Sequence, residues 1–145
     1  MTRAKRIQHL KASAIFIALF GLPALMVPFG FIQPLLNLFL DIVYLPFDGL
    51  PVHEGRASAI LFVITGGLTM GLAMQIYCVA EWVMPDQPEL GRRLILYPLF
   101  AWFICDSTAS VLVGAPFNAV LNLGFLLPPL FALRGEFNEK LAASA

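Results

Sequence analysis

Four long apolar runs divide the chain, and short polar segments separate them. The runs cover approximately residues 12–32, 57–80, 94–113 and 117–133. A helix needs roughly 20 apolar residues to cross the hydrocarbon core of a bilayer, and each run is close to that length. The pattern therefore predicts an all-α integral membrane protein, a four-helix bundle that forms one membrane domain over residues 1–145.

The segment between the first two runs, residues 33–56, has a different pattern. Its apolar stretch, from Leu35 to Leu45, is broken by polar side chains. At about 11 residues this stretch is too short to span the membrane. Asn37, Asp41 and Tyr44 follow at helical spacing, which places a polar stripe on one face. We expect a short interfacial or re-entrant helix at the outer surface.

Prolines and one glycine predict local distortions. The first run contains Pro23 and Pro28, so we expect a kink near Pro23 and a helix end near Pro28. The pair Pro128-Pro129 should distort the last helix near its cytoplasmic end. Gly114-Ala115-Pro116 makes a very tight outer turn, so the third and fourth helices should be adjacent and antiparallel.

The basic residues alternate with the apolar runs. Eight of the nine Lys and Arg residues fall on one side if all four runs cross: Arg3, Lys5, Arg6, Lys11, Arg92, Arg93, Arg134 and Lys140. Only Arg56 falls on the other side. Because Lys and Arg near the ends of spans are retained on the cytoplasmic side, both termini are expected to be cytoplasmic.

The composition agrees with lipid as the solvent. The chain is 59% hydrophobic and 12% charged, with mean hydropathy +0.83, whereas soluble domains are about 45–50% apolar and about 25% charged. The formal net charge of zero excludes a basic field for nucleic acid. The basic start could belong to a secretory signal, but no clear A-x-A site follows, so we expect a retained first helix.

Small residues mark one face of the second run. Gly67 and Gly71 are spaced by four positions, and Gln75 and Cys78 continue the same face. Such small residues let a neighbouring helix approach closely in lipid. Packing inside the bundle is the favoured interpretation, and a dimer face is the alternative. Cys78 and Cys105 both lie in apolar runs and are expected to be free, buried thiols.

Asp106 is the strongest candidate for chemistry because it lies in the middle of the third run. A carboxylate at this depth costs about 2.5–3.5 kcal/mol on insertion scales. It must therefore be protonated, paired or exposed to a wet cavity. No Lys, Arg or His lies at matching depth, so hydroxyls and amides are the expected partners: Ser110, Thr65, Thr69, Asn118 and Asn122.

The antiparallel turn predicts one particular contact between the third and fourth helices. Asp106 precedes Gly114 by about eight residues, and Asn122 follows it by the same number. At 1.5 Å per residue both lie roughly 12 Å below the turn. An Asp106–Asn122 hydrogen bond is therefore predicted. The candidate ligand-binding residues are Asp106, Ser110, Asn118, Asn122 and Gln75. The alternative is that Asp106 is a neutral acid with a structural role, hydrogen-bonded between helices.

Other catalytic and cofactor motifs are missing from the sequence. His9 precedes the first run and His53 lies in the outer segment, so the two cannot face each other as haem ligands within one chain. No Walker motif, G-x-S-x-G elbow or H-E-x-x-H sequence occurs. We therefore expect no metal, no cofactor and no catalytic residues.

Several short motifs in the second half of the chain occur in one known grouping. They are the glycines Gly66, Gly67 and Gly71, a Pro-flanked loop, Gly91-Arg92-Arg93-Leu94, and Val113-Gly114-Ala115-Pro116. With these features, residues 66–135 resemble the DoxX-like small four-helix bacterial membrane proteins. The resemblance implies a bundle in the bacterial inner (cytoplasmic) membrane with both ends cytoplasmic. It supplies no catalytic residues, and the segment 33–56 departs from it.

Three functions remain open at this point. The first is a non-enzymatic subunit or accessory factor of a larger membrane complex, such as a respiratory or photosynthetic one, or a homo-oligomer. The second is a binding protein or enzyme for a hydrophobic small molecule (quinone, lipid or sterol-like), with Asp106 in a polar pocket. The third is a proton or ion transporter, which one buried acid and no visible inverted repeat disfavour.

Overall fold

The structure is a computed structural model, which describes the backbone of residues 1–44 and 56–143 and the side chains of residues 1–44 and 57–134. The described residues form helices in the order α1 (Arg3–Leu25), a 3₁₀ turn (Val27–Phe29), α2 (Gln33–Tyr44), α3 (Arg56–Trp82), α4 (Pro88–Leu112) and α5 (Pro116–Ala143). Four of these helices are long and apolar enough to cross a membrane. The predicted all-α architecture is therefore confirmed for the described residues, with four helices of the length and apolar character that membrane spans require.

The helices extend beyond the predicted spans at their polar ends. Helix α1 begins at Arg3, where Thr2 caps it by accepting a hydrogen bond from the Lys5 backbone N–H at 3.4 Å. Helix α5 continues past the predicted end at residue 133 to Ala143. The apolar pattern marks the part of each helix suited to hydrocarbon. It does not mark where helical hydrogen bonding stops.

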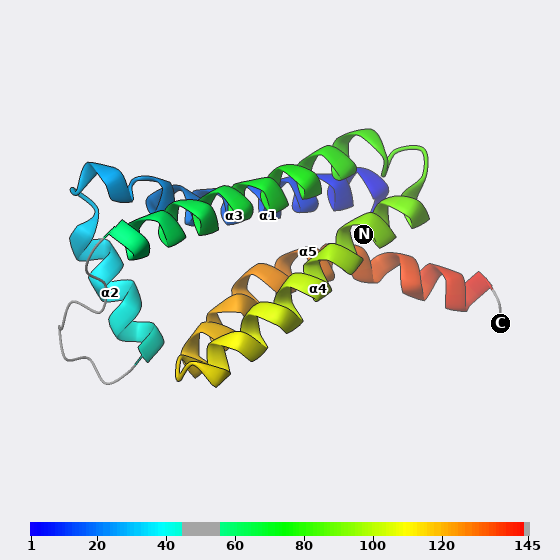
Figure 1. Ribbon diagram of the computed structural model, residues 1–145. Coiled ribbons are helices and arrows are strands. Elements are labelled where there is room, and N and C mark those ends of the chain that lie inside the picture. Colours follow the sequence, from blue (N-terminus) through cyan, green and yellow to red (C-terminus); the bar gives the residue numbers. More distant parts are fainter. Residues whose placement is uncertain (45–55, 144–145) are drawn as a thin grey trace.

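The prolines act in two ways. Helix α1 contains Pro23 and ends at Leu25, and the chain then turns through Pro28 to Gly30, whose φ is +75°. Helix α5 contains Pro128 and Pro129 but does not end there. Figure 1 shows that its axis changes direction between the orange and the red parts. A proline removes one backbone hydrogen bond from a helix. In α1 the helix ends soon after the proline, whereas α5 bends and continues.

The helices form two pairs (Figure 1). Helices α1 and α3 lie side by side along most of their length, and α4 and α5 form a second hairpin that runs obliquely to them. The pairs are close at one end and diverge toward the other, where α2 lies. The α1–α3 contact is tightest at two glycines: a Cβ on Gly66 would lie 2.9 Å from the Gly21 carbonyl oxygen.

The core lies at the end where the pairs converge. Side chains from all four long helices form one buried cluster: Leu10, Ala14, Ile17, Ala73, Ile76, Val79, Ala80, Met84, Ile95, Ala132 and Leu133. The Lys11 ammonium pairs with the Glu81 carboxylate at 2.6 Å and lies over the Tyr77 ring. Arg3 donates to the Pro85 carbonyl oxygen at 3.0 Å. Buried apolar area and these polar contacts hold this end of the bundle together.

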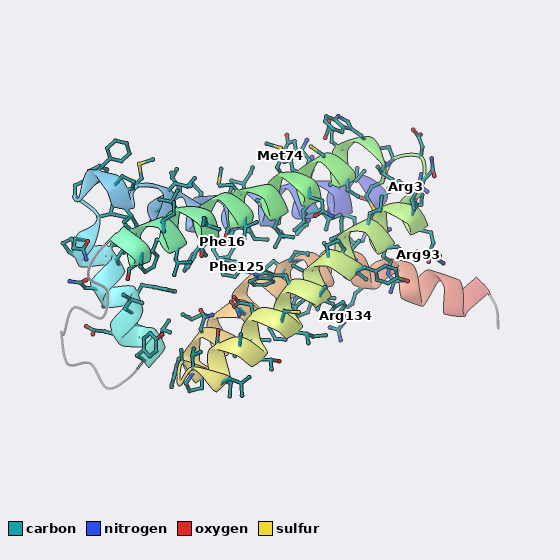
Figure 2. All side chains as sticks on the ribbon, in the orientation of Figure 1. Arg3, Phe16, Met74, Arg93, Phe125 and Arg134 are labelled. Carbon is teal, nitrogen blue, oxygen red and sulfur yellow. The ribbon has the colours of Figure 1, made fainter. Side chains whose placement is uncertain are left out.

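The basic residues gather at the same end. Arg3, Arg93 and Arg134 all lie there in Figure 2. Elsewhere large apolar side chains cover the surface, including Leu112 (81% exposed) and Leu68 (71%). In water such a surface would aggregate, whereas acyl chains solvate it. The four exposed apolar helices therefore fit a multi-pass membrane protein.

Helix α2 is amphipathic in the way the pattern predicts. Leu36, Leu40 and Val43 are buried at helical spacing. The Gln33 side-chain amide donates to the Asn37 side-chain oxygen at 3.1 Å on the polar stripe. The helix exists, but its interfacial or re-entrant position in a bilayer stays a prediction. Residues 45–55 of the predicted outer segment lie outside the described part of the chain.

Candidate functional site

A tight turn brings the polar residues of α4 and α5 to one level. Helix α4 ends at Leu112, and Gly114 adopts φ +82°, which only glycine reaches without strain. The Ala115 backbone N–H donates to the Ser110 carbonyl oxygen at 2.8 Å and closes the turn. Helix α5 then runs back beside α4, so residues equally far from Gly114 face each other.

Four side-chain hydrogen bonds join α4 to α5 here. The Asn122 amide donates to Asp106 Oδ2 at 2.6 Å and to Ser107 Oγ at 3.1 Å. The Asn118 amide donates to the same Oδ2 at 3.0 Å and to Ser110 Oγ at 2.9 Å. The predicted Asp106–Asn122 contact is confirmed. We refer to these five residues as the carboxyl–amide network.

Sequence reasoning missed Ser107 as a member of this network. Asp106, Ser107 and Ser110 lie on the side of α4 that faces α5, because positions i, i+1 and i+4 fall within one half of a helix. A serine beside an intramembrane acid was the signal that could have identified it.

The network has more acceptors than donors. Each amide has two N–H groups, and all four are used inside the network. Asp106 Oδ1 and the two amide oxygens accept no hydrogen bond from the described residues. The hydroxyl hydrogens of the two serines are the remaining donors. The network is therefore suited to bind a group that donates hydrogen bonds.

Aromatic rings border the network on the side toward the core. Trp102 lies one turn before Asp106 on α4, and Phe125 lies one turn after Asn122 on α5. Their ring centroids are 5.9 Å apart, and Phe20 of α1 meets Phe125 edge to face at 4.9 Å. In Figure 2, Phe125 lies near Phe16 between the two helix pairs.

The network itself is only partly covered. Asn122 is 3% exposed, whereas Asp106, Ser107, Ser110 and Asn118 are half-buried. The aromatic rings therefore close one side of the network, and another side remains open.

Gln75 lies apart from this network. Its side-chain amide donates to the Leu94 carbonyl oxygen on α4 at 3.0 Å. Pro98 is four residues after Leu94 and has no N–H, so the Leu94 carbonyl lacks its helical donor. Gln75 supplies that donor from α3 and ties α3 to α4. Gln75 therefore makes a contact that joins two helices, and it lies away from the other predicted ligand-binding residues, which belong to the carboxyl–amide network.

Gly67 and Gly71 of α3 do not make the close contacts inside the bundle that the favoured interpretation expects. A Cβ on Gly67 or Gly71 would meet nothing within 4 Å, so neither glycine packs against another described residue. Gly66 makes the close contact instead, because one residue further along a helix is a rotation of about 100°. Gly67 and Gly71 share a face with Gln75, which contacts α4. The two helices therefore meet at Gln75 and diverge beyond it.

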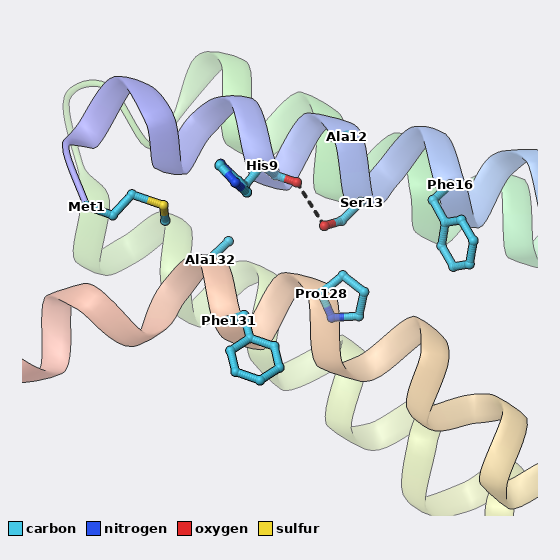
Figure 3. A pocket seen from close by; sticks show the side chains of 8 residues that line it. All are labelled: Met1, His9, Ala12, Ser13, Phe16, Pro128, Phe131 and Ala132. Carbon is cyan, nitrogen blue, oxygen red and sulfur yellow. Dashed lines mark hydrogen bonds between the residues drawn. The ribbon is translucent and has the colours of Figure 1, made fainter.

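One cavity lies away from Asp106. It measures about 470 Å³ and lies between α1 and α5, near His9 and Phe131 (Figure 3). The lipid-sized cavity around Asp106 stays a prediction. The thiol prediction is partly wrong: both cysteines are free, but Cys105 is exposed on α4 and Cys78 is half-buried. An exposed thiol on an apolar helix faces acyl chains.

Comparison of the chain with family models, curated proteins and solved structures finds no match. The DoxX-like resemblance therefore stays a prediction. Within the described residues, no group of three His, Cys, Asp or Glu side chains could hold a metal ion.

Proposed function

We propose that this chain is a small non-enzymatic subunit of a larger membrane protein complex, and that it binds a transmembrane helix of its partner between α3 and the α4–α5 hairpin. One observation carries the proposal: the carboxyl–amide network lies in the hairpin of two helices that are long and apolar enough to span a membrane, and no described residue donates a hydrogen bond to Asp106 Oδ1. A carboxylate left half-satisfied in hydrocarbon is costly.

The partner's chemistry follows from what the network lacks. The amide N–H groups already bind Oδ2 and the serines. A partner helix would therefore bring a hydroxyl, an amide N–H or a cationic side chain to Oδ1. In lipid such a contact is worth about 0.6–1.7 kcal/mol and also fixes the register between the helices.

The glycines of α3 supply the packing surface for this helix. A Cβ on Gly67 or Gly71 would meet nothing in the described structure, and both glycines lie on the side of α3 that carries Gln75, which contacts α4. A helix needs small residues to approach another closely in lipid, because packing replaces the hydrophobic drive there. The two features therefore support one binding surface, with dispersion on α3 and hydrogen bonding on the hairpin.

Copurification tests this proposal. After mild solubilisation of host membranes, the wild-type chain is expected to copurify with at least one other membrane protein. Asp106→Leu should lose that protein. Thr108→Leu should retain it, because Thr108 is exposed on α4 and lies outside the network. A lone, monodisperse wild-type chain, or equal retention by both variants, contradicts the proposal. A second copy in place of another protein identifies a homo-oligomer.

A hydrophobic small molecule is the second candidate occupant, with Asp106, Asn118, Asn122 and Ser110 as its polar anchors. The same free acceptor Oδ1 favours it. The ligand would have to donate, as the hydroxyl of a quinol or of a sterol-like lipid does, because the amides have no free N–H. Lipid extracts of the purified wild type that contain one such molecule, absent from Asp106→Leu, would support this function over the first.

Orientation in the bacterial inner membrane belongs to the proposal as well, with both termini in the cytoplasm. The gathering of Arg3, Arg93 and Arg134 at one end supports it, because basic residues remain on the cytoplasmic side.

Single-cysteine labelling checks this orientation. In a background that lacks Cys78 and Cys105, an impermeant maleimide should label Val113→Cys in intact spheroplasts. Gln87→Cys should react only after lysis, because the α3–α4 loop would lie inside. The reverse pattern, or labelling of both in intact spheroplasts, excludes this topology.

A further inference from the structure

The cavity between α1 and α5 has the shape of a half-open apolar pocket at the basic end of the bundle. Its lining residues are Met1, His9, Ala12, Ser13 and Phe16 of the α1 side and Pro128, Phe131 and Ala132 of α5. Figure 3 shows Met1 at one end of the cavity and Phe16 at the other. Small side chains cause the space, because Ala12, Ser13 and Ala132 leave room between the helices.

The cavity runs from the interface into the hydrocarbon. His9 precedes the apolar part of α1, whereas Phe16 lies seven residues further along, or roughly 10 Å deeper at 1.5 Å per residue. Its volume of about 470 Å³ falls within the range of about 300–1,000 Å³ that is typical of ligand sites. A ligand that fits would have a polar end near His9 and an apolar end near Phe16.

Two described basic residues adjoin residues that line the cavity. The Arg134 guanidinium lies 5.4 Å from the centre of the ring of Phe131, a lining residue, and is exposed. Lys5 lies one turn before His9 on α1 and is also exposed. No carboxylate occurs among the lining residues. Glu81, the acid within α3, is paired with Lys11.

One nitrogen of His9 remains available to a ligand. His9 Nδ1 lies 2.7 Å from the Lys5 carbonyl oxygen. A carbonyl oxygen only accepts, so Nδ1 carries the proton and donates. The other ring nitrogen, Nε2, bonds to no described residue. The Ser13 hydroxyl donates to the His9 carbonyl oxygen at 2.8 Å and so lines the cavity mainly with its apolar side.

We infer that this cavity binds an anionic phospholipid, with one acyl chain along Ala12 and Phe16 and the phosphate beside Arg134 and Lys5. Basic pockets between transmembrane helices on the cytoplasmic side of a membrane are typical sites for such headgroups. A zwitterionic lipid carries its own cation and gains less from these two basic residues. The site is separate from the carboxyl–amide network, so a test of lipid binding here is independent of the proposed function.

Native mass spectrometry of the full chain in mild detergent tests the inference, with phosphatidylglycerol and phosphatidylcholine of identical acyl chains as probes. Phosphatidylglycerol should bind at least fivefold more tightly. Arg134→Gln should weaken phosphatidylglycerol binding about fivefold, because one basic residue near the surface contributes about that much, and should weaken phosphatidylcholine binding by a smaller factor. Ala12→Phe should fill the cavity and weaken the binding of both lipids.

Two controls keep the outcome decisive. Ala101→Phe adds the same ring to an exposed position on α4 outside the cavity and should bind both lipids as the wild type does. Inorganic phosphate at the same concentration should not displace the lipid, because it lacks an acyl chain. Equal affinity for both lipids, wild-type binding by Ala12→Phe, or full displacement by phosphate would overturn the inference.

Discussion

Replacing Gly66 with leucine is expected to lower the thermal midpoint of the purified protein by roughly 10 °C, which corresponds to about 3 kcal/mol of overpacking. A Cβ at this position would lie 2.9 Å from the Gly21 carbonyl oxygen and 2.9 Å from the Leu25 backbone nitrogen. Both are main-chain atoms, so a side chain at residue 66 must push α1 away from α3. The loss of the monodisperse peak on heating in one detergent measures the effect.

The neighbouring glycine provides a matched control. Gly67→Leu places the same side chain one residue further along α3, where a Cβ meets nothing within 4 Å. Its thermal midpoint should equal or exceed that of the wild type, because leucine favours a helix more than glycine does. Equal losses for the two variants would show that α1 and α3 do not cross at Gly66.

Gly67→Leu also separates stability from assembly. The variant should be stable yet fail to copurify with the partner chain, because leucine would fill the surface proposed for the partner helix. A stable variant that still retains the partner would place the binding surface elsewhere on the protein.

Replacing Asn122 with leucine is expected to destabilise the protein by about 2–3 kcal/mol. Asn122 is 3% exposed, and its amide donates to the Asp106 carboxylate at 2.6 Å. Leucine has a similar volume, so packing is largely kept while the carboxylate loses a donor. A buried acceptor without its donor is penalised more than the absent bond alone would suggest.

The double variant Asp106→Leu/Asn122→Leu tests this prediction through the sign of its change in unfolding free energy relative to Asn122→Leu. It should be more stable than Asn122→Leu alone, because removing the carboxylate also removes the group that would keep only the Asn118 amide as a donor. A double-mutant cycle of unfolding free energies measures the coupling. Strictly additive losses, or a loss below about 0.5 kcal/mol for Asn122→Leu, would mean that the network contributes little to stability.

Much of the architecture was predictable because lipid imposes a strict rule on sequence. Each span must be apolar for roughly 20 residues, so four runs identify four helices. The Asp106–Asn122 contact was also predictable, because a tight antiparallel turn at Gly114 fixes the depth of residues on both sides. Depth in a hairpin depends only on counting residues, which needs no knowledge of the other helices.

Rotation and pairing among the helices were not predictable in the same way. Gly66 and Gly67 differ by one position, and which of them faces α1 depends on how α3 is rotated against it. Gln75 looked like a ligand anchor because it is polar within an apolar run. Its partner is the Leu94 carbonyl that Pro98 deprives of a donor, and only the α3–α4 arrangement brings the two together.

The uneven packing of the bundle connects structure to the proposed function. The converging end holds the buried core and the Lys11–Glu81 pair, so it keeps the four helices together. The diverging end carries Gly67 and Gly71, and the half-covered network lies between the aromatic rings and the Gly114 turn. The protein is thus stable at one end and offers an incomplete surface toward the other, as a subunit that accepts a partner helix requires.

Site-specific photocrosslinking in native membranes tests the central claim most directly. Leu68 lies on the same face of α3 as Gln75, which contacts α4, and is 71% exposed, while Leu19 is 62% exposed on α1. A photoreactive phenylalanine analogue at position 68 should crosslink to another protein, and Asp106→Leu should suppress that product. The same analogue at position 19 should react with lipid alone. Lipid adducts alone at both positions would contradict the account.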